Sequence, residues 1–330
     1  MEPTAHRSLA RRGSSRTLDR EVRKSTPMSR VRQMRAPLIA ALVLLVPLAE
    51  EPLLRADGPT LQRVVVFDEG HFNFHTTRGS YSQFAELLRK DGHTIIARPE
   101  PLDRKALAQA QLLVIADALS AEGNSAERGT LPWRWTRNAA LPAFTSNECD
   151  AAEEWVREGG GLLLIVDHPP YPAAARDLAR RFGVEVRNAS THDPTPGNHA
   201  QTTSTLVFTR SNGLLGDHAI TRGSDPAGRI NAITTFTGSS LAGPPNSTAF
   251  LKLSEAAYDQ FFESAGAPEQ RTSAKGRAQG VALQFGKGRV VVLGEAAMFR
   301  TGILEESAEG GFANRQLALN IVRWLSRLPE

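Results

Sequence analysis

The sequence predicts an α/β protein with three layers, in which helices cover both faces of a mostly parallel sheet. From Arg63 to Phe182, short apolar runs alternate with amphipathic segments, and this rhythm requires parallel strands joined by right-handed crossovers. Three apolar runs end at an acidic residue, namely Asp68, Asp167 and Glu295. Because the carboxyl ends of parallel strands line one crevice, these acids predict a ligand site there.

Each element of this pattern has its own signal in the chain. Continuous apolar runs predict strands at residues 63–67, 93–97, 112–116, 162–166 and 184–186. Segments with one apolar face predict helices at 81–90, near 102–110 and around 173–182. A further helix begins at the capping-box sequence Thr145-Ser146-Asn147-Glu148 and ends at the glycines that start with Gly159.

Two stretches interrupt the alternation. Residues 117–141 predict a long inserted loop, and residues 188–247 predict a long polar insertion with short strands at 205–208 and 233–236. The pattern returns with strands at 281–285 and 289–293 and a helix at 314–325. The turn Gly286-Lys287-Gly288 joins these two strands as an antiparallel hairpin.

The amino-terminal part differs in composition from the rest. Residues 1–35 contain ten Lys or Arg and three Asp or Glu, which predicts a disordered basic leader, with Met28 as an alternative translation start. Residues 36–56 predict an export signal or membrane anchor, because positions 36–49 carry no charge. Residues 57–330 form the predicted single α/β domain. We therefore expect a periplasmic or secreted protein whose only membrane contact is this segment.

The charge and the cysteine content argue against a nucleic-acid partner and an intramolecular disulfide. The net charge of +4 comes from the leader, and the remaining chain is mildly acidic, so a nucleic-acid partner is not expected. Cys149 is the only cysteine, so the chain has no intramolecular disulfide.

Several motifs resemble one superfamily. The stretch from Gly286 to Ala296 and the segment Asn320-Ile321-Val322-Arg323-Trp324-Leu325 resemble the closing module of class I glutamine amidotransferase-like domains. The sequences around Phe67–His75, Leu164–Pro169 and Asp217–Gly223 look like an uncharacterised bacterial family of that superfamily. The resemblance covers roughly residues 61–325 and implies a flavodoxin-like fold.

The chain departs from the amidotransferase pattern at the nucleophile. Such a glutaminase needs a Cys on a tight glycine-flanked turn after a central strand, whereas this position reads Asp167-His168-Pro169. Cys149 precedes that strand, early in a predicted helix. Glutamine hydrolysis is therefore not expected.

Residues after the first strand form one candidate cluster, composed of Asp68, His71, Asn73 and His75. An imidazole beside a carboxylate makes a tuned general acid or base. The structural alternative is that Asp68 caps the following turn and the histidines cover the sheet edge.

Asp167, His168 and Glu295 form the second set of candidate catalytic residues. Asp167 can act as a nucleophile or orient a base, and His168 can be that base. The alternatives are a polar turn fixed by two prolines at Asp167-His168, and a cap by Glu295 on the short turn that follows it.

Other residues have weaker functional signals. A metal site built from His71 and His75 with Asp68, Asp167 or His168 is one hypothesis, although the sequence names no metal or cofactor. Trp133 and Trp135 are candidates for stacking on a sugar ring, or they anchor the long loop. The remaining residues weighed are His218, expected to shape a turn, Cys149, expected to pack as an apolar group, and His192 and His199, which can reach the crevice.

We therefore expect an exported domain that binds a small polar, carbohydrate-like molecule at the carboxyl edge of its sheet. Two alternatives stay open. One is a hydrolase in which a histidine and a carboxylate activate water, with or without a metal. The other is a catalytically silent scaffold of the cell envelope.

Overall fold

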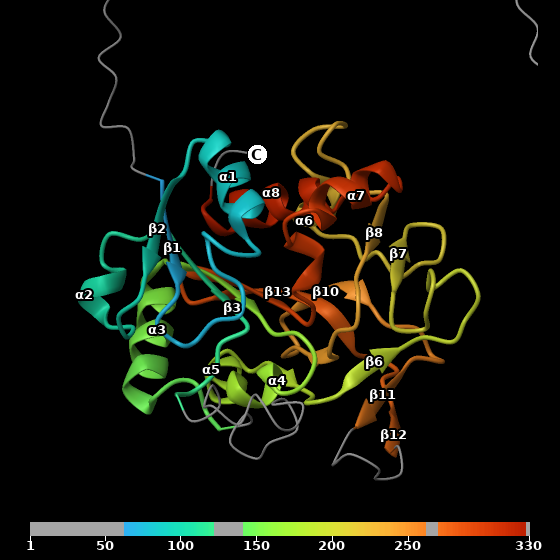
Figure 1. Cartoon of the computed structure of the whole chain (residues 1–330), viewed down its shortest axis with the longest axis horizontal. Helices are drawn as coiled ribbons and strands as arrows, with labels where there is room; N and C mark the ends of the chain where they lie inside the picture. The colour runs from blue at the N-terminus through green and yellow to red at the C-terminus, as the bar shows by residue number, and fades with distance from the viewer. Residues whose placement is uncertain (1–62, 122–140, 262–269, 328–330) are drawn as a thin grey trace, which may run out of the picture. The chain divides into compact units, whose positions relative to one another are not determined.

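A computed structural model describes residues 63–121, 141–261 and 270–327 (Figure 1). The predicted leader, the export segment and residues 122–140 of the predicted loop, which include Trp133 and Trp135, lie outside these residues. Within the described part of the chain, no helix is long and apolar enough to cross a membrane.

The central sheet is mostly parallel. Its five parallel strands lie in the order β2 (Thr94–Arg98), β1 (Val64–Asp68), β3 (Leu112–Ala116), β4 (Gly161–Ile165) and β14 (Gly288–Leu293). This is the flavodoxin-like order, in which β14 takes the place of the fifth strand. The predicted α/β fold is confirmed.

An antiparallel part extends the sheet beyond β14. Strand β13 (Ala278–Phe285) forms the predicted hairpin with β14, and β9 (Leu241–Ala242) and β5 (Glu185–Val186) follow it. Strand β10 (Thr248–Lys252) also pairs with β13.

Helices cover both faces because side chains alternate along each strand. Val65 and Phe67 belong to one core with α1 (Ser82–Lys90) and α8 (Asn314–Leu325). The alternate residues Val64 and Val66 belong to a second core. That core contains α3 (Ser146–Glu158) and α5 (Arg176–Arg181). The two cores give the three layers.

Two predicted helices are shorter than their sequence pattern indicated. The helix near 102–110 is the single turn α2 (Arg104–Leu107), in which only Leu107 is buried, so little packing supports a longer helix. The helix around 173–182 divides at Ala175 into α4 (Tyr171–Ala174) and α5. Pro172 lies in the first turn of α4, where proline is tolerated, and α4 ends after this single turn.

The polar insertion has more regular structure than the sequence indicated. Strands β7 (Val207–Thr209) and β8 (Ala232–Thr234) pair near the predicted positions, and α6 (Ala219–Arg222) lies between them. A three-stranded sheet joins β6 (Ser190–His192), β11 (Tyr258–Phe261) and β12 (Gln270–Ser273). The sequence pattern did not predict β10, β11 or β12, which are short and partly exposed.

The amino terminus of α3 supplies a test of the fold. The Thr145 hydroxyl accepts a hydrogen bond from the Glu148 N–H, and the Glu148 carboxylate accepts one from the Thr145 N–H, which confirms the predicted capping box. Thr145→Ala should lower the free energy of unfolding by about 1 kcal/mol in urea denaturation, because it removes this cap. Thr145→Ser retains the hydroxyl and should stay near wild type, and equal losses in both variants would contradict the capping role.

Candidate functional site

The register of β4 and β14 brings two acidic residues together. Ile165 pairs with Leu293, so Asp167 and Glu295 follow two residues later on the same face and at the same level. Both carboxyl groups are buried, and Glu295 accepts hydrogen bonds from the N–H groups of Ala297 and Met298. These bonds fix the 3₁₀ turn η4 (Ala297–Phe299), so Glu295 both caps a turn and borders the site.

A third carboxyl group, which sequence reasoning missed, belongs to Asp117. It follows β3, and its φ of +50° is a left-handed backbone conformation that Asp tolerates better than most residues. Its Oδ1 accepts a hydrogen bond of 3.0 Å from the N–H of Asp167. The signal was present in the sequence, since the apolar run Leu112–Ala116 also ends at an acid.

The three carboxyl groups hold protons more tightly than exposed acids do. Burial raises the pKa of Asp117 to about 7. Burial, reinforced by the negative charge of Asp117, also raises the pKa of Asp167 to about 7. Burial and the charge of Asp167 raise the pKa of Glu295 above its usual value. The group therefore does not hold three full negative charges at neutral pH.

His75 is buried beside these carboxyl groups. Its Nδ1 lies 2.5 Å from the Ser80 hydroxyl, and its Nε2 lies 3.3 Å from Asp117 Oδ2 without a well-aligned hydrogen bond. The ring stacks on Tyr81 at 4.4 Å between centroids. Burial lowers the pKa of His75 to about 4, against the attraction of Asp167, so the ring is neutral at pH 7.

His168 is the imidazole of the site that reaches solvent, with 26% of its side chain exposed. Its Nδ1 lies 2.9 Å from the carbonyl oxygen of Pro169. Because a carbonyl only accepts, Nδ1 carries a hydrogen, and Nε2 is the acceptor of the neutral ring. That Nε2 lies 3.9 Å from Asp167 Oδ2, too far for a direct hydrogen bond.

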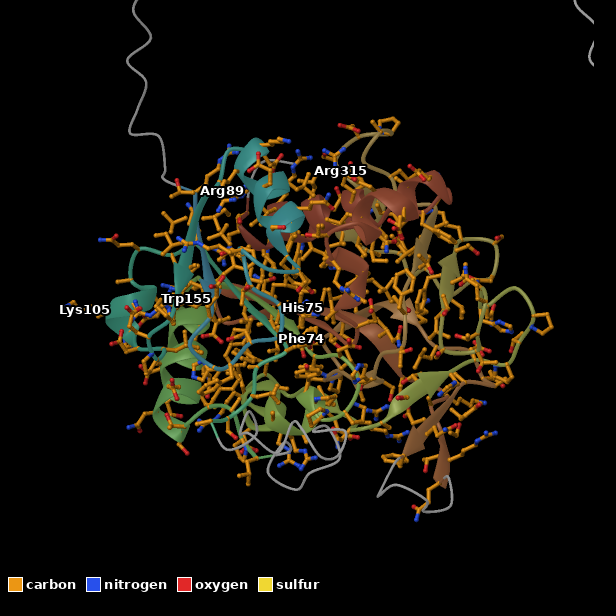
Figure 2. The ribbon with its side chains drawn as sticks, in the orientation of Figure 1. Phe74, His75, Arg89, Lys105, Trp155 and Arg315 are labelled. Carbon is orange, nitrogen blue, oxygen red and sulfur yellow. The ribbon has the colours of Figure 1, made fainter. Side chains whose placement is uncertain are left out.

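An aromatic side chain borders the same region. Phe74 is 56% exposed, and its ring lies 5.1 Å from His75 and 6.3 Å from Tyr171 between centroids. Its backbone N–H donates to the carbonyl of Asp117, which fixes the loop beside the carboxyl groups. Figure 2 shows Phe74 and His75 next to each other in the middle of the molecule.

The other predicted residues form a separate network. The His71 ring lies between two carboxylates, 2.8 Å from Asp68 Oδ1 and 2.9 Å from Glu148 Oε1. Asn73 donates to Asp68 and to the carbonyl of Ala116. Asp68 therefore ties the loop after β1 to α3, and among the described residues no hydrogen bond or ion pair joins Asp68 or His71 to Asp167, His168 or Glu295.

Side-chain alternation explains this separation. Phe67 faces the core with α1 and α8, so its neighbour Asp68 faces α3 instead. Burial alone would lower the pKa of His71, but the hydrogen bond and charge of Asp68, with those of Glu148, raise it. Both ring nitrogens are engaged, so this charged network joins structural elements and leaves the imidazole no free nitrogen for a substrate.

The predicted metal donor set is not assembled. His71 is bonded to Asp68 and Glu148, whereas His75 lies with Asp117 and Ser80. In residues 63–121, 141–261 and 270–327, no three His, Cys, Asp or Glu side chains are arranged to hold a metal ion. The candidates Trp133 and Trp135 lie outside the described residues.

The remaining single residues have structural contacts. His218 caps α6 through Nδ1, and Cys149 is buried, with burial raising the pKa of its thiol to about 11; both roles were expected. His192 stacks on Tyr258 and lies 3.0 Å from the Thr203 hydroxyl. His199 Nδ1 lies 3.2 Å from the carbonyl of Ala200.

Comparison with known proteins supports the fold alone. No family model and no curated protein sequence matches the chain. The solved mmIFT52 N-terminal domain aligns with 79% of this chain and 97% of its own at 14% identity and a TM-score of 0.56. This likeness agrees with the α/β fold described above.

Two further solved structures align at lower TM-scores. A ThuA-like protein from Bacteroides uniformis covers 83% of this chain and 95% of its own at 14% identity and a TM-score of 0.40. A GMP synthase-like protein from Thermoplasma acidophilum covers 81% of this chain and 94% of its own at 13% identity and a TM-score of 0.40. Membership of the amidotransferase-like superfamily stays a resemblance, since no family model matches.

The raised pKa values predict a pH dependence of stability. Between pH 4 and pH 7, folded Asp117 and Asp167 keep protons that the unfolded chain has lost, so their contribution to stability falls as the pH rises through this window. Asp167→Asn should make the loss of unfolding free energy between pH 5 and pH 8 smaller by about 1–3 kcal/mol, as measured by urea unfolding at the two pH values. The exposed Asp217→Asn should not, and identical pH profiles for wild type and Asp167→Asn would contradict the assignment.

Proposed function

We propose that the described domain binds a small, uncharged, hydroxyl-rich ligand of carbohydrate-like kind at the carboxyl edge of its sheet. The observation that carries the proposal is the gap between His168 Nε2 and Asp167 Oδ2. At 3.9 Å the two atoms are too far apart to bond each other, and a ligand hydroxyl between them can bond to both.

The hydrogen-bond roles of the two atoms are complementary. In the tautomer whose Nδ1–H donates to the Pro169 carbonyl, His168 offers a lone pair at Nε2. Asp167 has a pKa of about 7, so its protonated form is well populated at neutral pH and can donate from Oδ2. A hydroxyl group, which both donates and accepts, satisfies this pair.

The surroundings favour a neutral ligand over an ion. The clustered carboxyl groups repel anions, while their high proton affinity reduces the attraction for cations. The exposed ring of Phe74 supplies an apolar surface beside polar groups, a combination suited to the C–H face of a sugar. We also infer a location outside the cytoplasm, on the basis of the basic and apolar segments that precede the domain.

A hydrolase is the second candidate, and the same gap favours it. A water molecule held between His168 Nε2 and Asp167 Oδ2 would lie between two groups able to take and return a proton. Asp167 titrates near pH 7, which is where a general acid or base works best at neutral pH. In this role His168 accepts the proton of the water, and Asp167 returns one to the leaving group.

Calorimetric titration of the full-length protein with neutral mono- and disaccharides tests the proposal. His168→Ala and Asp167→Ala should each weaken binding of a bound sugar about tenfold, because each removes one hydrogen bond to the ligand. His199→Ala, which removes a histidine bonded elsewhere, should leave the affinity unchanged.

Two outcomes would contradict simple binding. If no sugar binds, or if His168→Ala binds as wild type does, the ligand assignment fails. If the sugar or a glycoside or ester of it is cleaved, with an optimum near pH 7 that His168→Ala abolishes, the hydrolase replaces it.

A further inference from the structure

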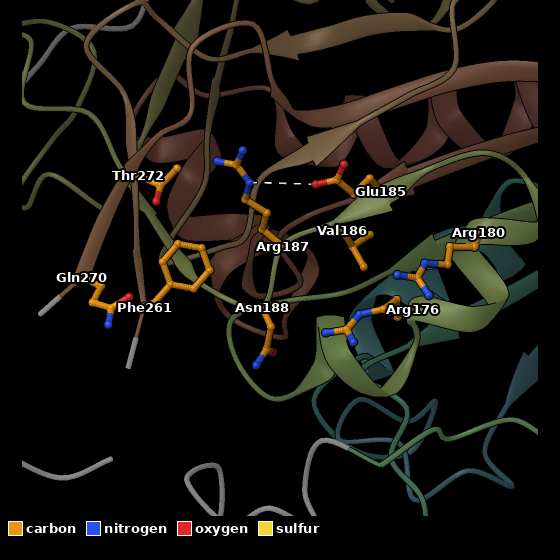
Figure 3. Close-up of a pocket in the computed structure, with 9 residues that line it drawn as sticks. All are labelled: Arg176, Arg180, Glu185, Val186, Arg187, Asn188, Phe261, Gln270 and Thr272. Atoms are coloured by element: carbon orange, nitrogen blue, oxygen red, sulfur yellow. Dashed lines mark ion pairs between the residues drawn. The ribbon is translucent and has the colours of Figure 1, made fainter. Parts of the chain in front are cut away.

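A groove away from the carboxyl site is rich in arginine. It lies among α5, β5, β11 and β12 and has a volume of about 630 Å³. Figure 3 shows its lining, with Arg176 and Arg180 extending from α5 toward Arg187 and the ring of Phe261. We call it the arginine groove, and its lining residues are Arg176, Arg180, Glu185, Val186, Arg187, Asn188, Phe261, Gln270 and Thr272.

Arg187 is held in place before any ligand arrives. Its Nη1 donates to Asp259 Oδ2 at 2.8 Å and to the carbonyl of Ser273 at 2.8 Å. Asp259 is fully buried and also accepts hydrogen bonds from Thr191 and Ser240. Among the described residues Nη2 of Arg187 has no hydrogen-bond acceptor, so a fixed guanidinium presents unused N–H donors.

The other charges leave the groove positive. Glu185 is bonded through Oε1 to Nη1 of the buried Arg277 at 3.0 Å, and it lies 4.0 Å from Nε of Arg187. Arg180 pairs only loosely with the exposed Asp177, at 3.8 Å. Within the described part of the chain Arg176 has no ion pair or hydrogen bond, so its charge is available to a ligand.

The rest of the wall combines an aromatic ring with polar groups. Phe261 is half-buried and faces the groove beside Arg187 in Figure 3. Asn188, Gln270 and Thr272 add amide and hydroxyl groups. The buried Oδ1 of Asn188 is a hydrogen-bond acceptor that has no donor among the described residues.

We propose that the arginine groove binds a small organic molecule that carries a phosphate or sulfate group. Guanidinium groups pair with tetrahedral oxyanions through two parallel N–H bonds, and three arginines line this groove, two of them from α5. Phe261 then packs against the apolar face of the organic part. The groove shares no residue with the carboxyl site, so this ligand is distinct from the one proposed there.

Calorimetric titration of the full-length protein with phenyl phosphate, phenyl sulfate, inorganic phosphate and phenol tests the proposal. The phosphate or sulfate ester should bind, and phenol should not. Arg176→Gln with Arg180→Gln should weaken ester binding at least about tenfold, whereas Phe261→Ala should weaken the ester but not inorganic phosphate. Arg89→Gln with Arg229→Gln removes the same charge elsewhere and should leave the affinity unchanged.

Three results would overturn the proposal. If both double variants lose the same affinity for the esters, the esters are attracted generally to a positive surface. If neither ester gives heat of binding, the groove does not bind them. Sedimentation with vesicles containing phosphatidic acid, in a protein that ignores phenyl phosphate, would assign the groove to a lipid headgroup.

Discussion

The parallel pairing of β4 with β14 determines where the chemistry of this protein lies. Because Ile165 pairs with Leu293, Asp167 and Glu295 emerge together on the same face of the sheet. Two acids so placed in a buried position cannot both ionise easily, since burial raises the pKa of both and the charge of Asp167 raises that of Glu295 further. The turn after β3 adds Asp117, whose side chain accepts the N–H of Asp167.

Hydrogen bonds from the surrounding loops hold this buried group in place. Ser239 of the polar insertion donates its hydroxyl to the carbonyl of Asp167, and Gly238 lies so close to Gly294 that a side chain there would clash. On the other side, the charged network of Asp68, His71 and Glu148 ties the loop after β1 to α3. The insertion and α3 therefore support a site to which neither supplies a carboxyl group.

The sequence was sufficient for the parallel strands, the β13–β14 hairpin and the start of α3, because long apolar runs and the cap at Thr145 are strong local signals. It placed Asp167, His168 and Glu295 at the carboxyl edge, but it grouped Asp68 and His71 with them. Side chains alternate between the two faces of a strand, so Asp68 belongs to one face of the sheet, whereas Asp167 and Glu295 belong to the other. This difference becomes clear only when the pairing register of the strands is known. Asp117 was missed because it begins a long irregular segment, in which an acid resembles an ordinary loop residue. Strands β10 to β12 were missed because they are short and partly exposed.

The central claim is that buried carboxyl groups at this edge share protons at neutral pH. Carbon-13 NMR of the aspartate side chains across a pH range of about 3 to 9, with Asp117→Asn and Asp167→Asn for assignment, measures this directly. We expect two carboxyl carbons that titrate together with apparent pKa values of about 7. If every aspartate is instead ionised by about pH 5, the site is a fixed cluster of negative charges, and shared protonation is ruled out.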